Sequence, residues 1–246
     1  MTRRKTFFTF ALMFVLFLGG LAGLALLVNH EPSFYRLAEV APGKLREELS
    51  SQFDGKKFSL AANYKEPPGP DSWEVVFTQE QINSFFAESF MRVGDDAKNL
   101  ESQGITAPRV SIEKDRLRLA FRYQNALVNT IISFDLRVWI VPNETNVFAV
   151  EILGRHAGAL PISVRAMQED ISKFARKYNL DATWYRQSGH PVALLRLKSK
   201  GQRPPTKFQR IELAERTLTI SGASLELPTN AKTKLPPNTQ LAPMGD

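Results

Sequence analysis

An uncharged run near the amino terminus limits most strongly what this chain can fold into. The run extends from Thr6 to Val28, contains twenty-three residues and consists mainly of Phe, Leu, Ala and Gly. Because an α-helix rises about 1.5 Å per residue, a helix of this length crosses a hydrocarbon core of about 30 Å with some tilt. We therefore expect residues 1–28 to form a short basic tip and a transmembrane anchor.

The charges that flank this run predict its orientation. Residues 3–5 are all Arg or Lys, whereas residues 29–31 contain neither. Because basic residues stay on the cytoplasmic side, the amino terminus is expected in the cytoplasm and the bulk of the chain in the periplasm or another extracytoplasmic space. The alternative is a cleaved signal peptide, for which Gly20–Ala22 or Gly23–Ala25 offers a cleavage site. The apolar run is longer than the 7–15 residues typical of a signal core, which favours an uncleaved single-pass anchor.

Composition excludes several classes of site. The chain has no Cys, so it forms no disulfide, thiolate metal site or cysteine nucleophile. The exported part must therefore be held together by its core, which its length and a hydrophobic content of 43% allow.

The net charge of +7 falls to +4 without residues 3–5, and the remaining charge is uneven. Seven Lys or Arg and no acid lie between Asp181 and Glu212. Nucleic acid is not expected as a partner outside the cytoplasm, whereas anionic lipid head groups or acidic envelope polymers are. A solvated basic loop is the alternative interpretation. The candidate head-group contacts are Arg186, Arg196, Lys198, Lys200 and Arg203.

The rest of the chain divides into three parts. Residues 29–72 are expected to be a juxtamembrane segment, with one or two helical turns in Lys44–Phe53, that ends in a Pro- and Gly-rich linker. Residues 73–221 are expected to form an α+β domain. Residues 222–246 contain four prolines and no apolar periodicity, so this tail is expected to be disordered.

Two amphipathic helices are predicted in the domain. After a strand at Trp73–Phe77, Thr78–Gln81 fits a capping box, and the helix that follows carries an apolar stripe from Ile82 to Phe90. Residues 92–107 are expected to be a loop. The second helix is expected to begin at Pro161 and to bury Val164, Met167, Ile171, Phe174 and Tyr178.

Alternating patterns between and after these helices predict an antiparallel sheet. Its longest strand, Val128–Ile140, exceeds the usual strand length, so it must curve strongly, twist or contain a bulge. Hairpins are predicted around it at residues 110–123, 182–197 and 208–221.

The sequence offers little for catalysis. His30, His156 and His190 fit no metal-ligand spacing, and the adjacent acids at 95–96 and 169–170 diverge where an acid/base pair must converge. The segment Gly154–Gly158 fits neither phosphate-binding template, so we expect its glycines to reverse the chain ahead of the helix at Pro161. No enzyme activity, cofactor or metal is expected.

A long antiparallel sheet curling round an amphipathic helix would bury the apolar faces of both. If side chains leave space between them, the lining forms a groove for an acyl chain, and if they do not, the core is simply filled. The candidate lining residues are Phe121, Ile132, Phe134, Leu136, Val138, Met167, Ile171 and Phe174.

Four short motifs, in this order, resemble the YpmS-type family of uncharacterised membrane-anchored bacterial proteins. They are Phe77–Asn83, Val150–Gly154, Gly158–Ile162 and the hairpin that follows, behind an amino-terminal anchor. Glu31–Arg36 also resembles the juxtamembrane start of anchored proteins from planctomycete-like bacteria. The resemblance covers roughly residues 7–198 and implies a TULIP-like organisation, in which a curved sheet wraps a helix around a lipid slot. It implies no catalytic residues.

Two functions remain open from the sequence. The first is non-enzymatic binding of lipid, or of another long apolar ligand, by a domain anchored near the membrane surface. The second is an envelope scaffold that binds a protein partner and has a filled core. The ligand, the partner and the oligomeric state are left open.

Overall fold

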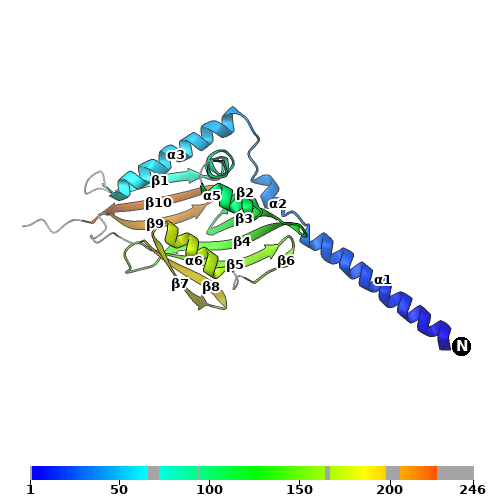
Figure 1. Cartoon of the computed structure of the whole chain (residues 1–246). Helices are drawn as coiled ribbons and strands as arrows, with labels where there is room; N and C mark the ends of the chain where they lie inside the picture. Colours follow the sequence, from blue (N-terminus) through cyan, green and yellow to red (C-terminus); the bar gives the residue numbers. More distant parts are fainter. Residues whose placement is uncertain (1, 66–71, 93–94, 164–166, 198–205, 226–246) are drawn as a thin grey trace, which may run out of the picture.

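The computed structural model describes residues 2–65, 72–92, 95–163, 167–197 and 206–225. An amino-terminal helix, α1 (Thr2–Val28), projects from an α+β domain (Figure 1). Among the described residues, one helical segment, Met13–Leu37, is long and apolar enough to cross a membrane. Most of this segment belongs to α1. The predicted apolar amino-terminal helix and the α+β class with a large antiparallel sheet are confirmed.

The large sheet has seven strands in the order β2-β3-β4-β5-β8-β7, with β6 paired to β5. Every pairing is antiparallel. The strands are β2 (Ile105–Glu113), β3 (Arg116–Gln124), β4 (Asn129–Ile140), β5 (Val147–Ala157), β6 (Leu160–Pro161), β7 (Leu180–Gln187) and β8 (His190–Leu197).

The long strand predicted at 128–140 is β4, and its pairing with β5 is irregular. Asp135 pairs with Gly154, but the next residue, Leu136, pairs with Ile152, so β5 contains one extra residue at this point. Such a bulge bends a strand pair and increases its twist. Gly154 therefore lies inside β5, and its predicted part in reversing the chain is wrong.

A second, three-stranded sheet has the order β1-β10-β9 and joins the two ends of the domain. It consists of β1 (Ser72–Thr78), β9 (Thr206–Ala214) and β10 (Thr217–Ser224). The predicted strand at 73–77 and the predicted hairpin at 208–221 are both confirmed. The first residues of the predicted disordered tail belong to β10, and residues 226–246 lie outside the described ranges.

The main hydrophobic core lies between the small sheet, one face of the large sheet and two helices. The helices are α3 (Lys44–Lys65) and α4 (Gln79–Phe85), and Phe53, Leu60 and Tyr64 of α3 pack against this core. The sequence predicted only one or two helical turns in this region, but α3 continues to Lys65. It continues because its apolar residues have the small sheet to pack against.

The capping box predicted at the start of α4 is confirmed. Thr78 Oγ1 accepts from the Gln81 amide, and Gln81 Oε1 accepts from the Thr78 amide. Beyond Phe85 the helix widens into a π-helical turn, η1 (Phe86–Phe90).

Polar side chains on α4 complete the outer edge of β2. The Asn83 side chain accepts from the Val110 amide at 2.8 Å and donates to the Val110 carbonyl at 2.9 Å. Gln79 Oε1 accepts from the Ile112 amide at 2.8 Å. Because Asn83 and Gln79 are four residues apart on a helix, they face alternate residues of the strand. The edge of β2 is thus covered by the helix.

Two further helical predictions are corrected. Residues 92–107 include a helix, α5 (Asp95–Ser102), and the beginning of β2. The helix predicted from Pro161 begins later, as α6 (Gln168–Lys177), because Leu160 and Pro161 form β6 against β5. Proline can occupy this short strand because a strand at an edge does not need every N–H donor. Val164, predicted on that helix, lies outside the described residues.

Candidate functional site

An open hollow of about 660 Å³ lies where the end of β4 meets β9 and the β7–β8 hairpin. The lining is mixed. The apolar lining residues are Val138, Trp139, Val141, Leu194, Ile211 and Leu213. The polar lining residues are Asp115, Arg137, Tyr185 and Gln187.

Arg137 has a fixed position in the wall of this hollow. Its Nε donates to Glu151 Oε2 at 2.8 Å, and its Nη2 contacts the same oxygen. The guanidinium carbon lies 5.8 Å from the centre of the Trp139 ring. The side chain is half exposed. An arginine held on one side by a carboxylate and an indole is well placed to meet an anionic group on the other.

Glu151 is the buried centre of this arrangement, with a side chain that is 1% exposed. His190 Nδ1 lies 3.0 Å from Glu151 Oε1, so each carboxylate oxygen has a partner. Burial raises the pKa of Glu151, but the hydrogen bonds from Arg137 and His190 outweigh it and hold the pKa below its usual value of 4.5. The carboxylate therefore stays ionised at neutral pH and orients both partners.

The predicted lining residues divide into three groups in the structure. Phe134 packs with Ile152 in a cluster that is joined by Phe121, Ile132, Leu136 and Met167, together with Trp184. Ile171 and Phe174 lie on α6, where Phe174 is 44% exposed and contacts Tyr178. Val138 alone of the eight lines the hollow described above. The structure thus brings five of the eight together.

The predicted basic contacts are spread over the β7–β8 hairpin and beyond it. Arg196 pairs with Glu144, at the turn between β4 and β5. Arg186 lies on β7, opposite Pro191. Lys198, Lys200 and Arg203 lie outside the described residues.

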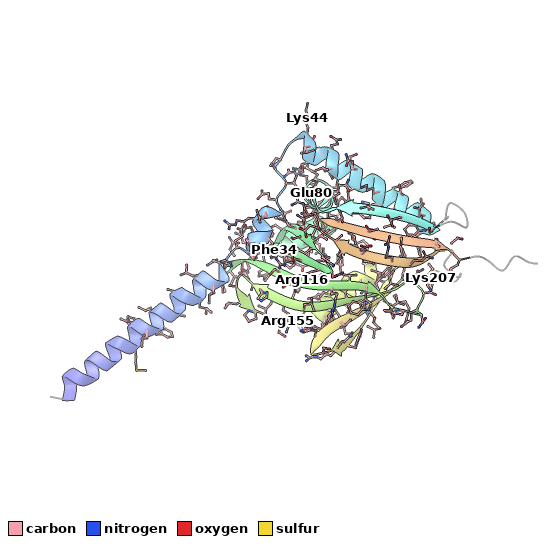
Figure 2. All side chains as sticks on the ribbon, turned by 180° about the vertical axis from the view of Figure 1, so that it is seen from behind. Phe34, Lys44, Glu80, Arg116, Arg155 and Lys207 are labelled. Carbon is pink, nitrogen blue, oxygen red and sulfur yellow. The ribbon has the colours of Figure 1, made fainter. Side chains whose placement is uncertain are left out.

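The end of α1 is joined to the domain through the turn between β5 and β6. The Ala159 amide donates to the Leu27 carbonyl at 2.8 Å, and Thr130 Oγ1 donates to the Val28 carbonyl. Gly158 has a φ of +59°, and a Cβ there would overlap both carbonyl oxygens. The turn at Gly158, where the sequence predicted a reversal of the chain, therefore receives the end of α1. Figure 2 shows Phe34, just after the anchor, close to this junction.

On the outer face of the large sheet, the short helix α2 (Ser33–Leu37) strengthens the junction. Tyr35 is buried against Ala120 and Ile131, and its hydroxyl donates to the Ala107 carbonyl at 2.9 Å. The Arg109 guanidinium lies 4.4 Å from the centre of the Tyr35 ring. The chain is thus held to the sheet directly after it leaves α1.

Sequence reasoning missed the group formed by Arg137, Glu151 and His190. Its members come from three different strands, and His190 was interpreted only as a hairpin residue. One signal was present, because Glu151 shares its side of β5 with Val147 and Ala149, which are both buried. A carboxylate among buried residues requires a partner. The described residues contain no group of three His, Asp or Glu side chains that could hold a metal ion.

Comparison with known proteins gives no relative: no family model, no curated protein and no solved structure matches this chain.

Proposed function

We propose that this chain is a single-pass membrane protein whose extracytoplasmic domain binds a lipid, or another long apolar ligand with an anionic head, without chemical turnover. The observation that carries the proposal is the hollow whose mixed lining combines six apolar side chains with Arg137. Apolar walls favour an acyl chain or a similar group, and the oriented guanidinium favours a carboxylate or phosphate.

The anchor and the hollow lie at opposite ends of β4. Thr130 contacts the end of α1, whereas Trp139 lines the hollow. Thr130 and Trp139 are nine positions apart along the strand, which corresponds to about 30 Å. A ligand in the hollow has therefore left the bilayer, and the domain holds it at a fixed height above the membrane.

The topology belongs to the same proposal. The basic residues at the start of α1 favour a cytoplasmic amino terminus and an extracytoplasmic domain. Protease added to intact spheroplasts is expected to digest the domain. Protection of the domain from protease would overturn this orientation.

The similarity to YpmS-type proteins and to a TULIP-like organisation also stays within the proposal. It is supported by the anchor, the large antiparallel sheet and the position of α6 beside β7. In this interpretation the packed cluster around Phe134 is the floor of the ligand-binding domain.

A scaffold that binds another protein is the second candidate. Phe134 is only 6% exposed and packs with Phe121, Met167 and Trp184, so side chains fill this part of the inner face. A filled core is what the scaffold function requires. The two functions differ in whether the hollow at Arg137 takes up a ligand.

The test is to reconstitute the full-length chain in nanodiscs, add anionic and uncharged fluorescent fatty-acyl probes and measure binding. Wild type is expected to bind the anionic probe more tightly, and Arg137→Gln is expected to weaken that binding about tenfold, which corresponds to about 1.4 kcal/mol. Arg216→Gln is a matched control, because Arg216 is also half exposed and paired, with Glu80. Equal binding by all three proteins, or by none, would overturn the proposal.

A further inference from the structure

The loop between β3 and β4, residues 125–128, lies beside the end of the membrane-spanning helix (Figure 1). Thr130 Oγ1 donates to the carbonyl of Val28, the last residue of α1. Leu127 precedes Thr130 by three residues, so the two Cα atoms are at most about 11 Å apart. The loop is therefore fixed close to the point where α1 leaves the membrane.

Leu127 is the most exposed large apolar residue of the described chain, at 93%. The loop holds it outward through Asn125, whose Oδ1 accepts from the Leu127 amide at 2.9 Å and from the Val128 amide at 2.8 Å. The Asn125 amide also donates to the Val128 carbonyl at 2.9 Å. An exposed leucine is ordinary on a soluble surface, but a tightly bonded loop that presents one beside a membrane anchor is not.

The position of Leu127 corresponds to the interfacial layer of a bilayer. The uncharged run of α1 ends at Val28, which marks the hydrocarbon boundary. The head-group layer beyond this boundary is about 5–8 Å thick, since a bilayer measures about 40–45 Å with both layers and about 30 Å without them. A loop attached to Val28 through Thr130 lies within reach of this layer.

The residues around the loop are of the types found at membrane surfaces. Asn125 Nδ2 donates to the hydroxyl of Tyr123 at 3.2 Å, and Arg122 pairs with Glu31 at 3.4 Å. Tyrosine and basic side chains are enriched where hydrocarbon meets head groups. An aromatic and a basic residue thus lie at the end of β3, where the loop begins.

We propose that the β3–β4 loop inserts Leu127 into the interfacial layer of the membrane that α1 spans. The domain then touches the bilayer at two points, the anchor and this loop, which together fix its tilt. The partner of Leu127 is the lipid surface, because the loop is bonded through Thr130 to the end of the membrane-spanning helix. This proposal does not depend on a ligand in the hollow.

The chain contains no Cys, so one substitution gives a unique site for a spin label. Leu127→Cys is compared with Phe58→Cys in the full-length chain, one copy per phosphatidylcholine–phosphatidylglycerol nanodisc. Phe58 is a matched control because it is 76% exposed and lies on α3, on the side of the domain away from α1 (Figure 1). The measurement is collision of the label with oxygen, which concentrates in lipid, and with a water-soluble nickel chelate.

The label at position 127 is expected to collide several-fold more with oxygen and several-fold less with the chelate than the label at position 58. Equal accessibility at the two sites would overturn the proposal. Protection from the chelate without a gain in oxygen collisions would also overturn it, because that result indicates a protein contact in place of lipid. Unchanged thermal unfolding of both variants verifies that each is folded.

Discussion

The amide of Ala159 donates a hydrogen bond of 2.8 Å to the carbonyl of Leu27, so a turn of the domain closes the last turn of α1. The final carbonyls of a helix have no partner within the helix and must find one elsewhere. Here the domain supplies a partner, so the end of α1 is bonded to the domain.

Gly158→Ala is expected to weaken this junction. A side chain at Gly158 combines an unfavourable positive φ with overlap of the Leu27 and Val28 carbonyls, so the free energy of unfolding should fall by about 2–4 kcal/mol. Gly189→Ala is the matched control, since Gly189 also has a positive φ, of +84°, but a methyl group added there would have no other atom within 4 Å. It should lose only about 1–2 kcal/mol.

Denaturant unfolding and hydrogen exchange at the Ala159 amide measure this difference in nanodiscs. Exchange at Ala159 should accelerate in the Gly158 variant and stay unchanged in the Gly189 variant. Equal losses of stability in the two variants would show that the junction contributes nothing.

Glu151 is expected to make the domain sensitive to acid. Because its pKa in the folded protein lies below the usual value of 4.5, the ionised form stabilises the fold. This contribution is fully present above pH 4.5 and is lost as the pH falls through the folded-state pKa. Denaturant unfolding between pH 3 and pH 7 should show a loss for wild type that is smaller in Glu151→Gln. Parallel pH profiles for the two proteins would contradict this assignment.

Asn83→Leu is expected to destabilise the domain by about 2–4 kcal/mol. The change removes both partners of Val110 and leaves a buried amide and a buried carbonyl without hydrogen bonds. Asn99→Leu, at an exposed position on α5, is the control and should change the stability by less than about 0.5 kcal/mol. Denaturant unfolding measures both, and similar values would mean that α4 does not support the edge of β2.

Leu194→Trp is expected to fill part of the hollow. Leu194 lines it and is only partly buried, so a larger side chain can extend into open space without straining the core. Binding of the anionic acyl probe should weaken at least about tenfold, while the thermal unfolding midpoint stays within a few degrees of wild type. Unchanged probe binding would place the ligand elsewhere.

Local features of the fold could be predicted from the sequence. Thr78 and Gln81 have the spacing of a capping box, and the unusual length of the strand ending at Ile140 predicted a strong curve, a twist or a bulge; the bulge lies in β5, opposite Asp135 and Leu136. Each of these predictions depends on residues close together in the chain. Features of this kind can be predicted because the residues that produce them are neighbours in the sequence.

Features that depend on distant partners could not be predicted in this way. The extent of α3 follows from packing of Phe53 and Tyr64 against strands that lie far from them in sequence. Pro161 has the properties of a first-turn helix residue, but pairing with His156 places it in a strand. The Arg137, Glu151 and His190 group likewise exists only after three strands have aligned.

The pairing of β1 with β10 determines when the domain can be completed. The strand order gives β1 one neighbour in its sheet, and that neighbour is the last strand of the described chain. During synthesis, β1 emerges early and must wait for β10 before its N–H and C=O groups are paired. Folding of the small sheet is therefore a late event, completed only after β10 has been synthesised. Until then, Trp73, Val75 and Phe77 lack their core partner Phe208 and stay exposed.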